Sequence, residues 1–154
     1  MDLHNFSVYC CFELSSITAR SLFQSYLDVL FAVECNRDVN YYDHIVSSLS
    51  RDIHCYCVQV NTSDYGDSRI TKPSKTEFMN SIKVKGGINP VVIIDCINVS
   101  DLRDFQLLAY NLQIHDSNGF KPTPPNFDRS IVLKKIRGDD IFDCLEDATN
   151  VKNV

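Results

Sequence analysis

The first half of the chain switches repeatedly between two hydrophobic periods. Short apolar runs of strand length, rich in β-branched and aromatic residues, stand at 6–12, 28–33 and 55–60. Between these runs, apolar residues recur every three or four positions from Ala19 to Leu30 and from Tyr42 to Ile53, which is the period of an amphipathic helix. Because parallel strands need helical crossovers, this order of strands and helices predicts an α/β layer with parallel pairing.

The pattern changes after residue 60. A polar stretch with turn formers at 61–69 predicts a loop, and alternation at 81–85 predicts a half-exposed strand. The apolar run at 91–97 predicts a buried strand. Ser100 is expected to cap a helix whose apolar face begins at Leu102.

The signals weaken beyond Asp116. Three prolines within 121–126 predict an extended surface arm. Residues 131–133 have the composition of a strand, and residues 140–148 that of a short helix. We therefore expect one domain at 6–115, followed by a C-terminal extension at 116–154.

Composition and charge narrow the class of protein. The 154 residues are 44% hydrophobic and 23% charged, as in an ordinary globular domain, and the formal net charge is −5. The absence of a long basic run argues against direct binding of nucleic acid. No apolar stretch has the length of a membrane span, and the first residues lack the basic and apolar regions of a secretory signal. These features predict a cytoplasmic protein.

Seven cysteines is a high and odd number for a chain of this length. Without an export signal, we expect free thiols, mostly buried in strands. His54, Cys55 and Cys57 are metal-binding residue types close together, but the two cysteines share one face of an apolar strand, and no second pair of ligands has zinc-site spacing. Core packing is the favoured interpretation, and we expect no metal and no other cofactor.

A series of short segments resembles the second half of the nitrilase-type carbon–nitrogen hydrolases. The strand and turn Val8-Tyr9-Cys10-Cys11-Phe12-Glu13-Leu14 is similar to the family's nucleophile segment. A strand ending at Asn61 and the loop Tyr65-Gly66-Asp67-Ser68-Arg69-Ile70 resemble the segments that follow it in the family. The likeness covers about residues 6–106, and it extends to the nitrilase-like domain attached to some bacterial defence reverse transcriptases.

The resemblance implies both a fold and a chemistry. The fold is an αββα sandwich, of which this chain holds the C-terminal half. Cys11 takes the place of the nucleophile in the hydrolysis of a non-peptide carbon–nitrogen bond, the backbone amide of Phe12 helps to hold the oxyanion, and Glu13 supports the site. The residues implied to bind substrate are Asn61, Tyr65 and Arg69.

The chain also departs from the family. Arg-Phe-Pro often follows the nucleophile segment, but Leu14-Ser15-Ser16-Ile17 stands here, which leaves the pocket wall and the substrate open. The family's catalytic glutamate and lysine lie upstream of the cysteine, and the ten residues before Cys11 contain neither. We therefore expect no hydrolase activity from this chain alone. A missing N-terminal half or a partner protein would supply both groups, and a homo-oligomer would be another way to cover the sheet that such a half leaves open.

Other interpretations of the same residues stay open at this point. Cys11 could be a buried strand cysteine, Glu13 could simply end the strand, and Arg69 could pair with an acid to pin its loop instead of binding a substrate carboxylate. The whole domain could be a non-catalytic nitrilase-like module that binds a partner protein, because kinship of fold does not fix function.

Overall fold

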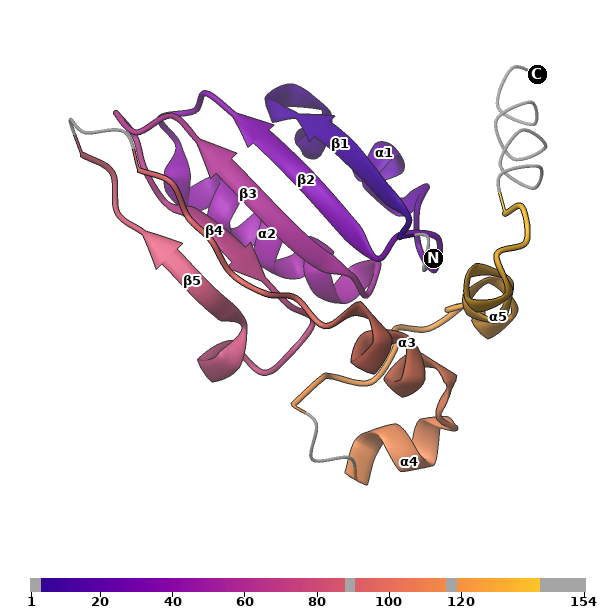
Figure 1. Ribbon diagram of the computed structural model, residues 1–154. Helices are drawn as coiled ribbons and strands as arrows, with labels where there is room; N and C mark the ends of the chain where they lie inside the picture. The colour runs from indigo at the N-terminus through magenta and orange to yellow at the C-terminus, as the bar shows by residue number, and fades with distance from the viewer. Residues whose placement is uncertain (1–3, 88–90, 116–118, 142–154) are drawn as a thin grey trace, which may run out of the picture.

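The computed structural model describes residues 4–87, 91–115 and 119–141, and a single five-stranded sheet forms its centre (Figure 1). The strands lie side by side in chain order: β1 (Phe6–Cys10), β2 (Val29–Glu34), β3 (Tyr56–Asn61), β4 (Ser68–Thr71) and β5 (Asn80–Val84). β1, β2 and β3 are parallel, whereas β4 and β5 are each antiparallel to the strand before. The predicted α/β class and its parallel pairing are confirmed.

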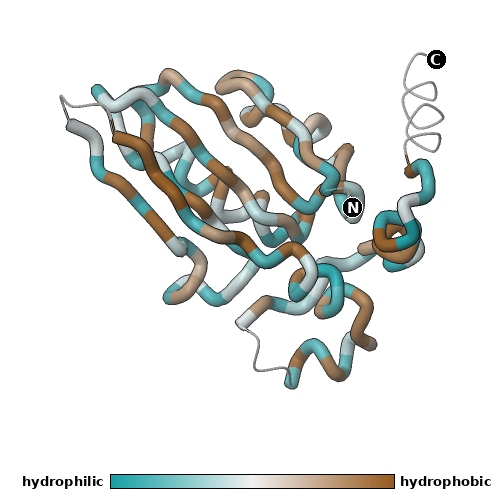
Figure 2. The backbone as a smooth tube through the Cα atoms, in the orientation of Figure 1, coloured by the Kyte–Doolittle hydropathy of each residue, from teal (hydrophilic) through white to brown (hydrophobic). Residues whose placement is uncertain are grey.

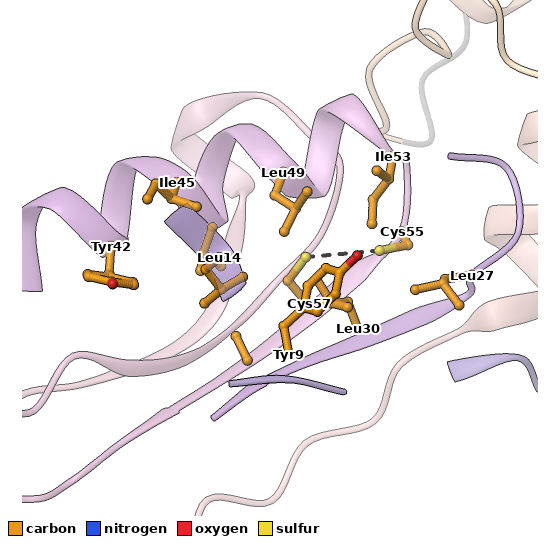
Figure 3. Close-up of a cluster of buried hydrophobic side chains, with 12 residues drawn as sticks. Tyr9, Leu14, Leu27, Leu30, Tyr42, Ile45, Leu49, Ile53, Cys55 and Cys57 are labelled. Carbon is orange, nitrogen blue, oxygen red and sulfur yellow. Dashed lines mark hydrogen bonds between the residues drawn. The ribbon is translucent and has the colours of Figure 1, made fainter. Parts of the chain in front are cut away.

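The crossover helices cover one face of the sheet, which we call the closed face (Figure 1). The 3₁₀ helix η1 (Cys11–Ser15) and helix α1 (Ile17–Ser21) join β1 to β2, and α2 (Val39–Asp52) joins β2 to β3. The side chains of Ser16 and Asp38 accept backbone N–H groups at the starts of α1 and α2. Figure 3 shows the core between α2 and the strands, which includes Tyr9, Leu14, Leu27, Leu30, Tyr42, Ile45, Leu49, Ile53, Cys55 and Cys57.

The C-terminal helices lie near the amino ends of the parallel strands (Figure 1). They are α3 (Val99–Leu107), α4 (Tyr110–His115) and α5 (Arg129–Arg137), and a short 3₁₀ helix η2 (Thr76–Phe78) precedes β5. A second apolar cluster joins α3 to the side of the sheet opposite the closed face. It contains Val29, Tyr56, Val99, Leu102, Phe105 and Phe120. No helix in the described ranges is long and apolar enough to cross a bilayer.

A buried ionic cluster ties α3 and α5 to the start of β2. Arg103 Nη2 lies 2.6 Å and Lys135 Nζ 3.1 Å from carboxylate oxygens of Asp28, and the backbone N–H of Asn5 donates to the same carboxylate at 2.9 Å. Burial by itself raises the pKa of Asp28, but the hydrogen bond from Arg103 and the charge of Lys135 outweigh it and lower this pKa. Asp28 therefore stays ionised at neutral pH.

Two strand predictions are wrong. Residues 91–97 form no strand; they are an extended, largely exposed segment, because no described strand lies beside them to accept their hydrogen bonds. Residues 131–133 belong to α5, in which Ile131, Val132 and Lys135 are buried at helical spacing.

The helix and loop predictions also need correction. The helix expected from Ala19 to Leu30 ends at Ser21, and a turn follows in which Ser25 adopts a φ of 74°, outside the right-handed helical region. Ser68 and Arg69, expected in a loop, begin β4, and the cap of α3 is Asn98 instead of Ser100.

The C-terminal extension is also less simple than predicted. The expected surface arm at 121–126 is partly buried, since Thr123 is bound by Gln113 and the carbonyl of Lys121 lies 2.8 Å from His54 Nε2. The helix expected at 140–148 lies almost entirely outside the described residues.

The described cysteines are free thiols, as predicted, but most are not buried. Cys55 and Cys57 lie in the core, whereas Cys10, Cys35 and Cys96 are exposed. The core-packing interpretation of this segment is confirmed, because His54, Cys55 and Cys57 are fully buried. Burial lowers the pKa of His54 to about 4, so the ring is neutral in the core.

Candidate functional site

The candidate site lies where the three parallel strands end. β1 stops at Cys10 and the chain turns at once into η1, so Cys11 stands beside the loops that follow β2 and β3. Its side chain is partly exposed, and Asn36 Nδ2 donates a hydrogen bond to Cys11 Sγ at 3.1 Å. The carboxyl ends of parallel strands are where open α/β sheets place their binding groups.

Asn61 holds Asn36 in position from the neighbouring strand. Asn61 Oδ1 accepts the backbone N–H of Asn36 at 3.0 Å, and Asn61 Nδ2 donates to the carbonyl of Asn36 at 2.9 Å. The remaining donor and acceptor of the Asn61 amide bind the carbonyl of Gly66 and the N–H of Thr62. Four hydrogen bonds engage this side chain, so Asn61 acts on the site through Asn36.

Tyr42 and Glu34 complete the surroundings of the thiol on the closed face. Burial and a hydrogen bond with Cys11 raise the pKa of Tyr42 to about 12, and the nearby Glu34 charge adds to the effect. The phenol therefore stays protonated at neutral pH. Glu34 is only 6% exposed, and its Oε2 accepts Gln59 Nε2 at 2.9 Å while its Oε1 has no partner among the described residues. Burial raises the pKa of Glu34, although Gln59 and the charge of Arg69 oppose the shift.

Glu13 and Phe12 shape the turn that presents Cys11. Glu13 Oε2 accepts the backbone N–H of Cys10 at 2.7 Å, so this carboxylate fixes the end of β1. Phe12 lies in the first turn of η1, where backbone N–H groups have no partner within the helix. Its side chain is 84% exposed. A free N–H next to a cysteine is the geometry that an oxyanion would use.

Arg69 lies on β4, on the closed face between the sheet and α2, and is almost fully buried. Its Nε donates to Gln59 Oε1 at 2.7 Å, and its Nη1 pairs with Asp43 of α2, which Lys83 also binds at 3.1 Å. Burial favours protonation of Asp43, but the hydrogen bonds from Arg69 and Lys83 prevail and lower its pKa. Arg69 thus connects β4 to α2.

The loop between β3 and β4 packs against the segment that follows β5, at the point where Gly66 approaches Gly86. A Cβ on Gly66 would lie 2.1 Å from the backbone nitrogen of Gly86, so only glycine permits this approach. Gly66 also has a φ of +75°, in the left-handed region. In the same loop, Tyr65 receives a hydrogen bond from Arg37 Nε at 3.0 Å. The loop is therefore held at the same end of the sheet as Cys11.

The structure brings together only part of the set predicted from sequence. Cys11, Phe12 and Glu13 share one turn, and Asn61 reaches that turn through Asn36. Arg69 is buried below, and Tyr65 pairs with Arg37.

Asn36, Tyr42 and Glu34 were not anticipated. Asn36 stands just beyond an apolar strand, a position that could have drawn attention because polar residues at strand ends line such sites. Nothing in the helical pattern distinguishes Tyr42 from an ordinary core residue.

No family model, no curated protein and no solved structure matches this chain. The chemistry of the site must therefore be argued from its own residues. They provide a partly exposed thiol with an amide donor at its sulfur, in the first turn of a 3₁₀ helix.

Proposed function

We propose that this chain is the C-terminal half of a cytoplasmic nitrilase-type carbon–nitrogen hydrolase domain, with Cys11 in the place of the nucleophile. The observation that carries the proposal is the position of Cys11 in a turn directly after a parallel strand, with Asn36 Nδ2 3.1 Å from its sulfur. A thiolate is the attacking form of cysteine, and a donor aimed at the sulfur suits that form.

The proposed reaction needs two groups at Cys11, and the carboxylates already near it serve the fold: Glu13 binds the backbone N–H of Cys10, and Glu34 is buried and binds Gln59. A base must take the thiol proton, and a positive charge must stabilise the oxyanion in the family chemistry implied by the resemblance. The nearby lysines are engaged elsewhere: Lys83 binds Asp43, and Lys85 lies 3.9 Å from Asp67. Losing one oxyanion donor typically costs about 3 kcal/mol, a hundredfold or more in rate. We therefore propose that the chain is inactive until another polypeptide segment brings a glutamate and a lysine to Cys11.

The test compares thiols within one protein. The purified chain is treated briefly with iodoacetamide, and the labelling of each cysteine is measured by peptide mass spectrometry. Cys11 should react much faster than the buried Cys55 and Cys57, and Asn36→Leu should change the Cys11 rate several-fold while leaving the distant, exposed Cys96 unchanged. Labelling of Cys11 as slow as that of Cys55, or a rate indifferent to Asn36, would contradict the proposed role.

Catalysis is tested in parallel. Ammonia release from simple amides and nitriles should be undetectable with the chain alone, and turnover abolished by Cys11→Ser but not by Cys10→Ser would overturn the proposed inactivity. The second candidate is a non-catalytic interaction module. It is favoured by the complete internal engagement of Asn61, and it predicts that Asn36→Leu has no specific effect on Cys11.

A further inference from the structure

The face of the sheet opposite α2, which we call the open face, carries no charged side chain on any of its five strands. Strand alternation places these residues on it: Phe6, Val8, Cys10, Val29, Phe31, Val33, Tyr56, Val58, Val60, Ser68, Ile70, Ile82 and Val84. α3 covers the part of this face at the amino ends of the parallel strands, where it contacts Val29 and Tyr56. Phe6 is nevertheless 61% exposed, and Val8, Val33 and Val60 are 47–49% exposed.

The area of the open face follows from the dimensions of the sheet. A sheet of five strands about 4.8 Å apart and about 16 Å long has roughly 400 Å² of flat area. A patch of about that size is the largest on an ordinary monomer and is often functional. Two such faces together have about 800 Å² of flat area. Side chains make the accessible surface larger than the flat area, so a face-to-face contact would bury on the order of 1,000 Å², the lower bound of a specific interface. A single partner of matching shape could therefore cover it.

The extended segment 91–97 stands over part of this face as the start of a second layer. Val91 and Ile93 line a cavity of about 500 Å³ together with Val58, Val60 and other residues of the sheet. Figure 2 shows the hydrophobic colour of this segment, in front of the strands. Val92 and Ile94 are 85% and 84% exposed, so residues 91–94 are apolar on both sides, and Asp95 follows them.

The backbone of segment 91–97 also lacks a strand partner among the described residues, although the Cys96 N–H is bound by Asp95 Oδ1 of the same segment. No backbone hydrogen bond joins residues 91–97 to any other described residue. β1 pairs only with β2 in the described part of the chain, so it has one free edge as well. Free strand edges beside an apolar face are a template for pairing with another chain.

We infer that a second copy of this chain covers the open face, in a two-fold dimer whose sheets pack face to face. The strands of this face bear no charge, and the charged group of segment 91–97, Asp95, is engaged by Ser81 and by the N–H of Cys96. Nothing on the strands therefore favours an acidic or basic partner, and the face is chemically complementary to itself. Packed sheets lie about 10 Å apart, with their inner side chains interdigitated. The free edge of segment 91–97 pairs in this dimer with a strand of the second copy.

This inference rests on the open face and not on the chemistry of Cys11. It does bear on the proposed function, because a layer carrying the missing glutamate and lysine would compete for the same face. The dimer is then a form without hydrolase activity. The two proposals can fail independently. The dimer is tested by the molecular mass in solution, whereas the role of Cys11 is tested by the reactivity of its thiol.

The experiment is sedimentation velocity over a range of micromolar concentrations. Wild type should sediment as a dimer, whereas Val8→Lys and Val60→Lys each place an unpaired charge in the interface twice and should weaken the dimer about a hundredfold or more. The matched control is Ile17→Lys on α1, since Ile17 is β-branched, exposed and on the other side of the sheet. Circular dichroism checks that each variant is folded. Because two positions are substituted separately, the test still works if one of the two variants does not fold.

A dimer in wild type and Ile17→Lys, lost in Val8→Lys or Val60→Lys, supports the inference. A monomeric wild type at high micromolar concentration would overturn it and leave the face to a different polypeptide. A series of ever larger oligomers, or a dimer insensitive to both open-face variants, would also overturn it.

Discussion

The closed and open faces of the sheet invert the usual relation between polarity and exposure. The closed face is buried under α2, yet it holds Glu34, Gln59 and Arg69 in a connected network. The open face contacts solvent over much of its area, yet it presents valine, isoleucine and phenylalanine. Buried polar groups are normal when they are hydrogen-bonded, and an apolar patch as large as the open face is often a site of interaction. The difference is the basis of our inference that the closed face is covered within the chain and that the open face is an interface.

The largest effect should come from breaking the buried ionic cluster that anchors α3 and α5. Asp28→Asn leaves Arg103 and Lys135 buried without their counter-charge, and we expect a loss of about 3–5 kcal/mol in the free energy of unfolding. Urea denaturation measures it. Asp104→Asn, an exposed acid on the same helix as Arg103, should change stability by no more than about 0.5 kcal/mol. Equal effects of the two substitutions would contradict the role assigned to Asp28.

The next largest effect compares the two faces of one strand, β2, by the loss of stability on truncating a side chain from each. Leu30→Ala removes a fully buried side chain from the closed-face core and should cost about 2–5 kcal/mol. Val33→Ala, on the open face, should cost less than about 1 kcal/mol at low protein concentration, and its cost should grow as concentration rises and the dimer forms. If its cost does not depend on concentration, Val33 is not in a dimer interface.

The smallest effect concerns the pH dependence of stability. The pKa of Glu34 is raised in the folded state, so ionising it opposes folding, and its contribution to stability is lost as pH rises from the unfolded value of about 4.3 through the folded pKa. Glu34→Gln should therefore gain stability relative to wild type over this window, by on the order of 1 kcal/mol. Urea titrations at several pH values measure the gain. The exposed Glu77→Gln serves as control, and a gain for Glu34→Gln that is equal at every pH would contradict the assignment.

Local sequence patterns predicted the closed half of the fold well. The strands at β1, β2 and β3 and the helix α2 follow from apolar runs and helical spacing, because their neighbours are all encoded in this chain. The same reasoning failed at residues 91–97. Their composition is that of a buried strand, but burial needs strands that the described chain does not contain. The wrong strand prediction at residues 91–97 and the exposure of the open face have the same cause, which is that no further strands of the described chain lie beside them.

Prediction of the site was limited in a different way. Cys11 was selected by resemblance, and its turn position and exposure agree with an accessible thiol, but the residues around it come from three other segments. Asn36 follows β2, Tyr42 lies on α2 and Asn61 ends β3. Only the packing of α2 on the sheet brings them together, and no local pattern encodes that contact.

Hydrogen–deuterium exchange of the backbone amides in residues 91–97 tests most directly whether the open face is an interface. Within the described chain no backbone carbonyl accepts these amides, and only the Cys96 N–H has a side-chain acceptor, Asp95 Oδ1, so protection of the other amides would come from association. We predict rapid exchange at low micromolar concentration and marked slowing at high micromolar concentration, with the slowing absent in Val8→Lys. Fast exchange at every concentration, with no change at β1, would contradict the account.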